Sequence, residues 1–318
     1  MQLDEFQGLI AQVRSEIGKA VQGQNTLIDQ LLVSLFARGH CLIEGPPGTA
    51  KTLLARSLAS AVNLKFGRVQ FTPDLMPGDV IGVNLFNFQT NSFALTRGPV
   101  FSDLLLADEI NRAPPKTQSA LLQAMNERTV TIDGKDYPLG PNFFVVATQN
   151  PIEQQGTYPL PEAQLDRFLF KLLVEFPDRE AEIAILTRHA AQPLDFESRR
   201  AGITCVLSPE ALEGGRSLVD AIRLAPAILT YIVDLIRATR ADADILHGAS
   251  TRAADALAGA VRAQAALEGR DYGIPDDVQA LLLPCLRHRI VLGPSAEIEG
   301  RTADEVLSNI LNRVDAPR

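Results

Sequence analysis

The sequence predicts an α/β fold in which a parallel sheet, covered by helices on both faces, precedes a small helical domain. In the first half of the chain, short apolar runs alternate with segments of helical periodicity, which is typical of strands buried on both faces. After Pro177 these runs give way to helical patterns rich in alanine, leucine and arginine. We therefore expect a three-layer αβα domain over residues 1–176 and an all-helical domain over residues 177–318.

The elements of the first domain can be assigned in order. Two helices precede the first strand, because apolar residues recur at helical spacing on both sides of the turn-like Gly23. The first of these helices carries Leu3, Phe6, Ile10, Val13 and Ile17, and the second carries Leu27, Leu31, Leu32 and Leu35. The expected strands are residues 41–44, 68–71, 104–108, 143–148 and 168–174.

Two insertions interrupt this alternation and read as β-hairpins. Near residues 84–97, Phe86–Phe88 and Phe93–Leu95 alternate with period two around a polar turn at residues 89–92. Near residues 129–139, Val130–Ile132 faces Tyr137 across Asp133-Gly134, which is a strong hairpin turn signal. Both hairpins are expected to project from the domain, and ordinary hairpins at the sheet edge are the alternative.

The second domain is expected to be helical because proline repeatedly follows a residue suited to the start of a helix. Ser208-Pro209, Ala225-Pro226 and Ile274-Pro275 each place proline in the first turn.

The bulk composition limits the function. The chain has 318 residues, 30 basic against 38 acidic side chains and a formal charge of −8, which disfavours DNA binding through a generally basic surface. A local basic patch is not excluded. Its three cysteines, Cys41, Cys205 and Cys285, are far apart, so we expect a reducing compartment without a disulfide framework. With neither a signal-like N-terminus nor a bilayer-length apolar run, the chain is expected to be soluble and cytoplasmic.

A phosphate-binding loop connects the first predicted strand to the helix that begins near Leu53. Its residues are Gly45, Pro46, Pro47, Gly48, Thr49, Ala50, Lys51 and Thr52. Backbone N–H groups at such a junction and the positive end of the helix dipole favour a triphosphate. Lys51 is expected to reach its outer phosphates and Thr52 to ligate Mg²⁺. Ala50 replaces the usual second glycine, and we expect it to be tolerated through helical φ/ψ values.

Polar residues end the strands that follow this loop. Asp108 and Glu109 come at the carboxyl end of a predicted parallel strand, where open α/β sheets bind ligands. We expect Asp108 to hold Mg²⁺ and Glu109 to polarise the attacking water; a solvated acidic turn is the alternative. Asn150 follows the strand at 143–148 and is expected to orient water or the γ-phosphate, unless Asn150-Pro151 only makes a turn.

The order of these motifs resembles the MoxR family of AAA+ ATPases. The resemblance covers almost the whole chain, to about Arg289. It rests on six segments: Val21–Gln24, Gly45–Thr52, Asp108–Arg112, Thr148–Pro151, Leu160–Phe168 and Gly248–Ala253.

The resemblance implies roles for particular residues. Lys51 and Thr52 would belong to the Walker A motif, Asp108 and Glu109 to Walker B, Asn150 to sensor 1 and Arg252 to sensor 2, and Val21, Gln22 and Gly23 would line the adenine pocket. Arg167 would be the arginine finger inserted into a neighbouring subunit's site. Arg112 and Arg128 remain alternatives for the finger, and Thr251 stands where relatives often carry proline.

The resemblance also implies a function. ATP and Mg²⁺ would be the cofactors, the chain would hydrolyse ATP in a hexameric ring, and hydrolysis would remodel a protein client. A protein with a von Willebrand factor A domain is the expected partner. The two hairpins would match the helix 2 insert and the pre-sensor 1 hairpin. An ATP-gated scaffold with little turnover, which Ala50 favours, and a DNA-linked or chelatase-type motor remain alternatives.

Overall fold

The predicted parallel sheet is confirmed. A computed structural model describes residues 1–89, 91–151, 156–191 and 202–317. Its main sheet has five parallel strands in the order β2-β5-β8-β1-β9. These strands are β1 (Cys41–Glu44), β2 (Phe66–Gln70), β5 (Leu104–Asp108), β8 (Phe144–Gln149) and β9 (Phe170–Leu173). Each overlaps an apolar run that predicted it.

Helices cover both faces of this sheet. On β1, Cys41 and Ile43 pack into one hydrophobic cluster and Leu42 packs into another, as alternation along a strand requires. The first cluster contains residues of α1, α2 and α3, and the second contains residues of α4 and α5. These helices are α1 (Leu3–Ala20), α2 (Asn25–Phe36), α3 (Lys51–Ala61), α4 (Pro77–Ile81) and α5 (Pro115–Glu127).

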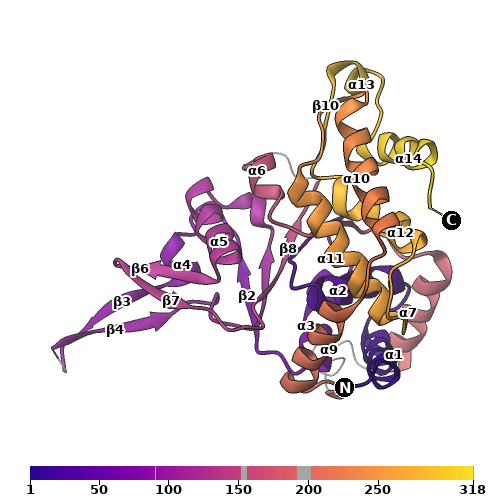
Figure 1. Cartoon of the computed structure of the whole chain (residues 1–318). Helices are drawn as coiled ribbons and strands as arrows, with labels where there is room; N and C mark the ends of the chain where they lie inside the picture. The colour runs from indigo at the N-terminus through magenta and orange to yellow at the C-terminus, as the bar shows by residue number, and fades with distance from the viewer. Residues whose placement is uncertain (90, 152–155, 192–201, 318) are drawn as a thin grey trace.

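Both predicted hairpins form. The first pairs β3 (Gly82–Asn87) with β4 (Ser92–Arg97), and position 90 of its predicted turn lies outside the described residues. The second pairs β6 (Thr129–Ile132) with β7 (Lys135–Pro138) across Asp133-Gly134, where both turn residues have positive φ. Figure 1 shows both hairpins extending from the sheet away from the helical part of the molecule.

The helical part follows β9. Its helices are α7 (Arg179–Ala191), α9 (Pro209–Ala221), α10 (Pro226–Ala241), α11 (Thr251–Leu267), α12 (Pro275–Leu286), α13 (Pro294–Ile298) and α14 (Ala303–Arg313). Proline begins α9, α10 and α12, as predicted. The sequence predicted helices alone here, whereas β10 (Ile245–His247) and β11 (Val291–Leu292) also pair as a small antiparallel ribbon. Within the described residues, every helix is too short or too polar to span a bilayer.

The helical part shares a core with the first two helices of the chain. One cluster of buried residues runs from the sheet through α1 and α2 to α9, α10, α11 and α12. Gly215 of α9 makes this packing close, because a Cβ there would lie 2.6 Å from the rings of Phe6 and Phe36. We retain residue 176 as the proposed boundary between the domains, since β9 is the last strand of the sheet.

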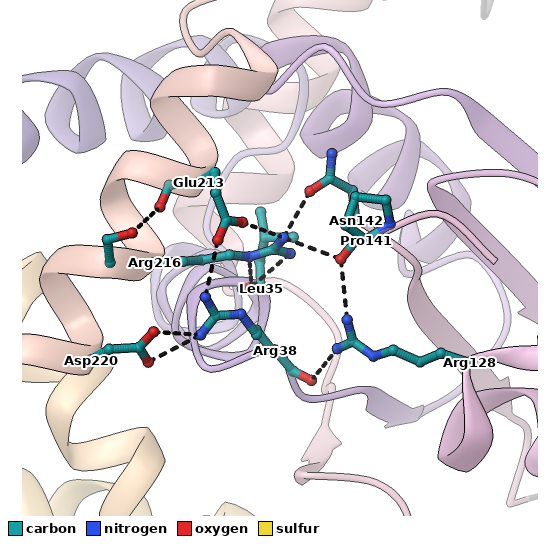
Figure 2. A network of polar contacts seen from close by, with 9 residues as sticks. Leu35, Arg38, Arg128, Pro141, Asn142, Glu213, Arg216 and Asp220 are labelled. Atoms are coloured by element: carbon teal, nitrogen blue, oxygen red, sulfur yellow. Dashed lines mark hydrogen bonds and ion pairs between the residues drawn. The ribbon is translucent and has the colours of Figure 1, made fainter. Parts of the chain in front are cut away.

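A buried arginine ties α9 to the base of the second hairpin (Figure 2). Arg216 is only 1% exposed, and its guanidinium donates to the carbonyl of Leu35 and to Asn142 Oδ1, the latter at 2.7 Å. It also donates to the carbonyl of Pro141 at 3.4 Å, and Arg128 donates to the same oxygen at 3.1 Å. Three segments distant in the sequence are therefore joined at one point.

Candidate functional site

The loop between β1 and α3 needs its two glycines for different reasons. A Cβ on Gly45 would lie 2.4 Å from the carbonyl oxygen of Val174, so only glycine fits against the chain that leaves β9. Gly48 has open space around it but a φ of +84°, which glycine adopts without strain. The first glycine permits close backbone packing, and the second permits the turn.

The expectation that Ala50 has helical φ/ψ values is wrong. Ala50 lies in the left-handed region, with φ 60° and ψ 20°. The reason is its position: Ala50 is the N-cap residue of α3, where the backbone is not yet helical although its carbonyl already accepts the first helical bond, from the Leu54 N–H at 2.9 Å. This conformation costs a residue with a Cβ about 1–2 kcal/mol.

Lys51 begins α3 and lies folded against its own loop. Its Nζ donates to the carbonyl oxygens of Gly45 at 2.8 Å and Pro46 at 2.7 Å. Burial lowers the pKa of Lys51, while the negative charges of Asp108 and Glu109 act in the opposite direction. An ammonium held by neutral carbonyls can exchange them for the oxygens of an anion at little cost, and the first amides of α3 have no partner within their own helix.

Asp108 and Glu109 are oriented by a residue that we did not assign from the sequence. The hydroxyl of buried Thr148, on β8, donates to Asp108 Oδ1 at 2.6 Å and accepts from the Glu109 N–H at 2.9 Å. Glu109 has a φ of 56°, a strained value that redirects its side chain from the strand direction. The available signal was a threonine at the carboxyl end of the neighbouring parallel strand.

Three further polar side chains hold the two carboxylates. Arg68 donates to Asp108 Oδ2 at 2.7 Å, and Gln70 donates to Glu109 Oε2 at 2.8 Å. Arg112 donates to the same Glu109 oxygen at 3.1 Å. Arg68 and Gln70 lie on β2, and the sequence contained no local signal for them because their partners are about 40 residues away.

A cavity of about 380 Å³ lies between the loop, the start of α3 and the ends of β5 and β8. It brings together Lys51, Thr52, Asp108, Glu109 and Asn150, all of which the sequence placed in one site. The complete lining is Pro47, Gly48, Thr49, Ala50, Lys51, Thr52, Leu53, Asp108, Glu109, Thr148, Gln149 and Asn150.

The residues of this cavity suit Mg²⁺ and a nucleotide. Mg²⁺ prefers oxygen ligands and commonly uses one or two carboxylates together with substrate phosphates, which Thr52 and Asp108 could complete. Outside the lining, Gln22 has a buried Oε1 without a hydrogen-bond partner in the described structure, and such an acceptor suits an amino group like that of adenine. Val21, the residue before Gln22, is buried, and Gly23, the residue after it, has a φ of +74°.

Arg167 and Arg252 do not line the cavity. The Arg252 side chain is 64% exposed and lies 3.6 Å from Asp166 Oδ2, while Arg289 binds the other oxygen of that carboxylate at 2.8 Å. Arg167 directly follows Asp166, after α6 (Glu162–Leu165). Within the described part of the chain, its guanidinium has no ion pair or hydrogen bond.

The other two finger candidates bind groups of their own chain. Arg112 pairs with Glu109, and Arg128 donates to the carbonyls of Pro141 and Arg38 in the network of Figure 2. Burial lowers the pKa of Arg128, and the nearby charge of Arg38 lowers it further.

Comparison with known proteins identifies two family regions. Residues 40–170 match the ATPase family associated with various cellular activities (AAA), and residues 237–310 match an AAA lid domain. The first match contains the loop, β5 and β8, and the second contains Arg252.

Relatives match over nearly the whole chain. The uncharacterized protein YeaC of Bacillus subtilis is 41% identical, over 99% of this chain and 97% of its own length. Chaperone MoxR1 of Mycobacterium tuberculosis is 39% identical, over 98% of this chain and 85% of its own length. Protein MoxR of Methylorubrum extorquens is 32% identical, over 99% of this chain and 97% of its own length.

A solved structure agrees with these relatives. The crystal structure of a "putative ATPase" from Cytophaga hutchinsonii is 40% identical, superposes with a TM-score of 0.91 and matches over 99% of this chain and 97% of its own. The predicted resemblance is thus confirmed by sequence and fold together: the chain belongs to the MoxR family of AAA+ ATPases.

Proposed function

We propose that this chain hydrolyses ATP with Mg²⁺ in an oligomer and uses the energy to remodel a protein client. The observation that carries the proposal is the single cavity shared by Lys51 and Thr52 of the loop and by the Asp108-Glu109 pair at the end of β5. Phosphoryl transfer needs positioned charges more than covalent chemistry, and this cavity collects them.

Each residue has a proposed task. The loop amides and the start of α3 hold the triphosphate, and Lys51 exchanges its carbonyl partners for phosphate oxygens. Thr52 and Asp108 would hold Mg²⁺, which neutralises charge on the phosphates when bound. Glu109 takes a proton from the attacking water, and Asn150 orients that water or the γ-phosphate.

The cavity supports a site that a neighbouring subunit completes. Among its described lining residues, Lys51 is the only cation, whereas transition-state charge in phosphoryl transfer is commonly met by a further arginine. The Arg167 guanidinium binds no other group among the residues that the structure describes, and Arg167 is the proposed trans finger. Arg252 is the proposed sensor from the helical lid. We propose a homo-oligomer, with a hexameric ring as the expected form.

The proposed client contact uses the first hairpin. Phe88 is 88% and Phe93 is 71% exposed, and exposed aromatic clusters mark interaction sites. One relative is named a chaperone, which favours protein remodelling over a DNA-linked motor. A partner with a von Willebrand factor A domain follows from the family and is part of this proposal.

The first experiment compares Lys51→Ala and Glu109→Gln with the parental chain, and with Lys116→Ala as a control for loss of an exposed lysine. We expect Lys51→Ala to abolish nucleotide binding and Glu109→Gln to bind ATP without releasing phosphate. Parental turnover by Glu109→Gln would show that the assigned water activator is wrong. Binding without turnover by the parental chain would support the ATP-gated scaffold instead.

A second experiment tests the finger by mixing inactive subunits. Arg167→Ala and Glu109→Gln subunits should regain part of the phosphate release when combined, because one interface then has an intact Arg167 beside an intact Glu109. No recovery over a range of mixing ratios counts against Arg167 acting in trans.

The client and partner can be captured with the Glu109→Gln chain. In the presence of ATP, proteins that co-purify with it from the native source should include one with a von Willebrand factor A domain, and Lys51→Ala should lose them. Capture that is equal with Lys51→Ala argues against an ATP-dependent complex.

A further inference from the structure

We propose that Arg68 is a resident counter-ion of Asp108 that opposes Mg²⁺, so that removing its charge strengthens Mg²⁺ binding. The inference rests on the proposed function, because it concerns the carboxylate expected to hold the metal. Arg68, on an edge strand, would thus set the Mg²⁺ concentration at which the site is half occupied.

The geometry makes Arg68 a direct partner of this carboxylate. Its NH2 group donates to Asp108 Oδ2 at 2.7 Å and to Gln70 Oε1 at 2.8 Å. Arg68 and Gln70 are two residues apart on β2 and therefore share one face of the strand, and Gln70 is paired in register with Asp108. Since Thr148 occupies Oδ1, both oxygens of Asp108 already have a donor.

Arg68 approaches Asp108 from outside the cavity. It is not among the residues that line the cavity, although Asp108 is. β2 is one of the two edge strands of the sheet, and the Arg68 side chain is 42% exposed, against 13% for Asp108. The guanidinium can therefore move into solvent without disturbing the packed core.

The opposing charges define the consequence. A mostly buried carboxylate without a cation needs a partner, and Arg68 supplies one. A carboxylate has enough lone pairs to accept a guanidinium and ligate a metal together, so the conflict is one of like charge and not of exclusion. Arg68 should thus weaken Mg²⁺ binding by a moderate factor. An arginine that instead contacts the phosphates would strengthen nucleotide binding, which is the opposite sign.

Arg223 offers a matched control. Arg223 pairs with Asp271 at 2.6 Å, and the side chains of both residues are well exposed. It is not a residue of the cavity. Arg223→Gln therefore removes the same charge and the same kind of pair as Arg68→Gln, and Arg68→Lys keeps the charge at the tested position.

The experiment measures binding of a fluorescent methylanthraniloyl ADP to the full chain while Mg²⁺ is titrated, which requires no turnover. We expect the half-saturating Mg²⁺ concentration to fall about fivefold in Arg68→Gln and to change less than about twofold in Arg223→Gln and Arg68→Lys. A factor of about five equals about 1 kcal/mol, the upper range for a partly exposed ion pair.

The outcomes separate this inference from the function beneath it. If the parental chain binds the analogue and Arg68→Gln needs equal or more Mg²⁺, the counter-ion role is refuted while nucleotide binding stands. If the parental chain binds no analogue at any Mg²⁺ concentration, the proposed function is refuted, and the role of Arg68 is refuted as well because it depends on that function. An equal fall in Arg223→Gln would show a general effect of net charge and would also refute the role of Arg68.

Discussion

Replacing Ala50 with glycine tests the loop conformation, because the two possible backbones predict opposite signs. In the left-handed conformation observed, removal of the Cβ relieves about 1–2 kcal/mol of strain. Glycine also gives the unfolded chain more freedom, which costs about 0.4–1 kcal/mol. The free energy of unfolding should therefore rise by about 0.5–1 kcal/mol. Had Ala50 been helical, as its sequence context suggested, the same change would lower it by about 1 kcal/mol.

The assay is equilibrium urea unfolding of the nucleotide-free chain, followed by circular dichroism. The midpoint should move to higher urea in Ala50→Gly with an unchanged slope. Ala11→Gly, at an exposed position inside α1, is the matched control and should lose about 1 kcal/mol. A loss of stability in Ala50→Gly as large as in Ala11→Gly would refute the left-handed assignment.

Three further predictions follow from buried contacts. Arg216→Met takes the guanidinium donor away from the Leu35 carbonyl and from Asn142 Oδ1, and should lower the free energy of unfolding by about 3 kcal/mol in urea titrations. A cost below about 1 kcal/mol would contradict the network. Burial lowers the pKa of His40 from 6.5 to about 4, so the unfolded chain binds a proton in this range and the folded chain does not. The stability that His40 contributes above pH 6.5 is therefore lost as the pH falls toward 4. His40→Gln should remove up to about 3 kcal/mol of this pH dependence of the free energy of unfolding, and an unchanged pH profile would exclude this histidine as its source. Gly45→Ala brings a Cβ to within 2.4 Å of the chain leaving β9 and should weaken binding of fluorescent ADP at least about tenfold, whereas parental affinity would mean that the loop accommodates the methyl group.

Much of the fold could be predicted because its signals are local. The apolar runs of β1, β5 and β8, the Asp133-Gly134 turn and the prolines that begin α9, α10 and α12 each act within a few residues. The loop and the Asp108-Glu109 pair could also be assigned to one cavity, because each directly follows a recognisable strand and parallel strands bring their carboxyl ends to the same edge of the sheet.

The features that escaped prediction depend on contacts between distant segments or on backbone geometry. Thr148 and Arg68 reach Asp108 from other strands. The position of Thr148 at the carboxyl end of a parallel strand was the one available signal, and no spacing in the sequence marks Arg68. Ala50 is a good helix former, so its type hid a left-handed backbone. The strands β10 and β11 have three and two residues, too short for a period of two to be recognised.

The carbonyl of Pro141 receives donors from two arginines that belong to different parts of the molecule, one before β6 and one on α9. This shared hydrogen-bonding network also restricts which substitutions evolution can accept. A substitution at Arg216 leaves unmet acceptors in two other segments at once, so tolerated replacements should arise as coordinated sets and not singly. Among homologues, the identity of position 216 should therefore vary together with position 142, whose side chain binds the same guanidinium.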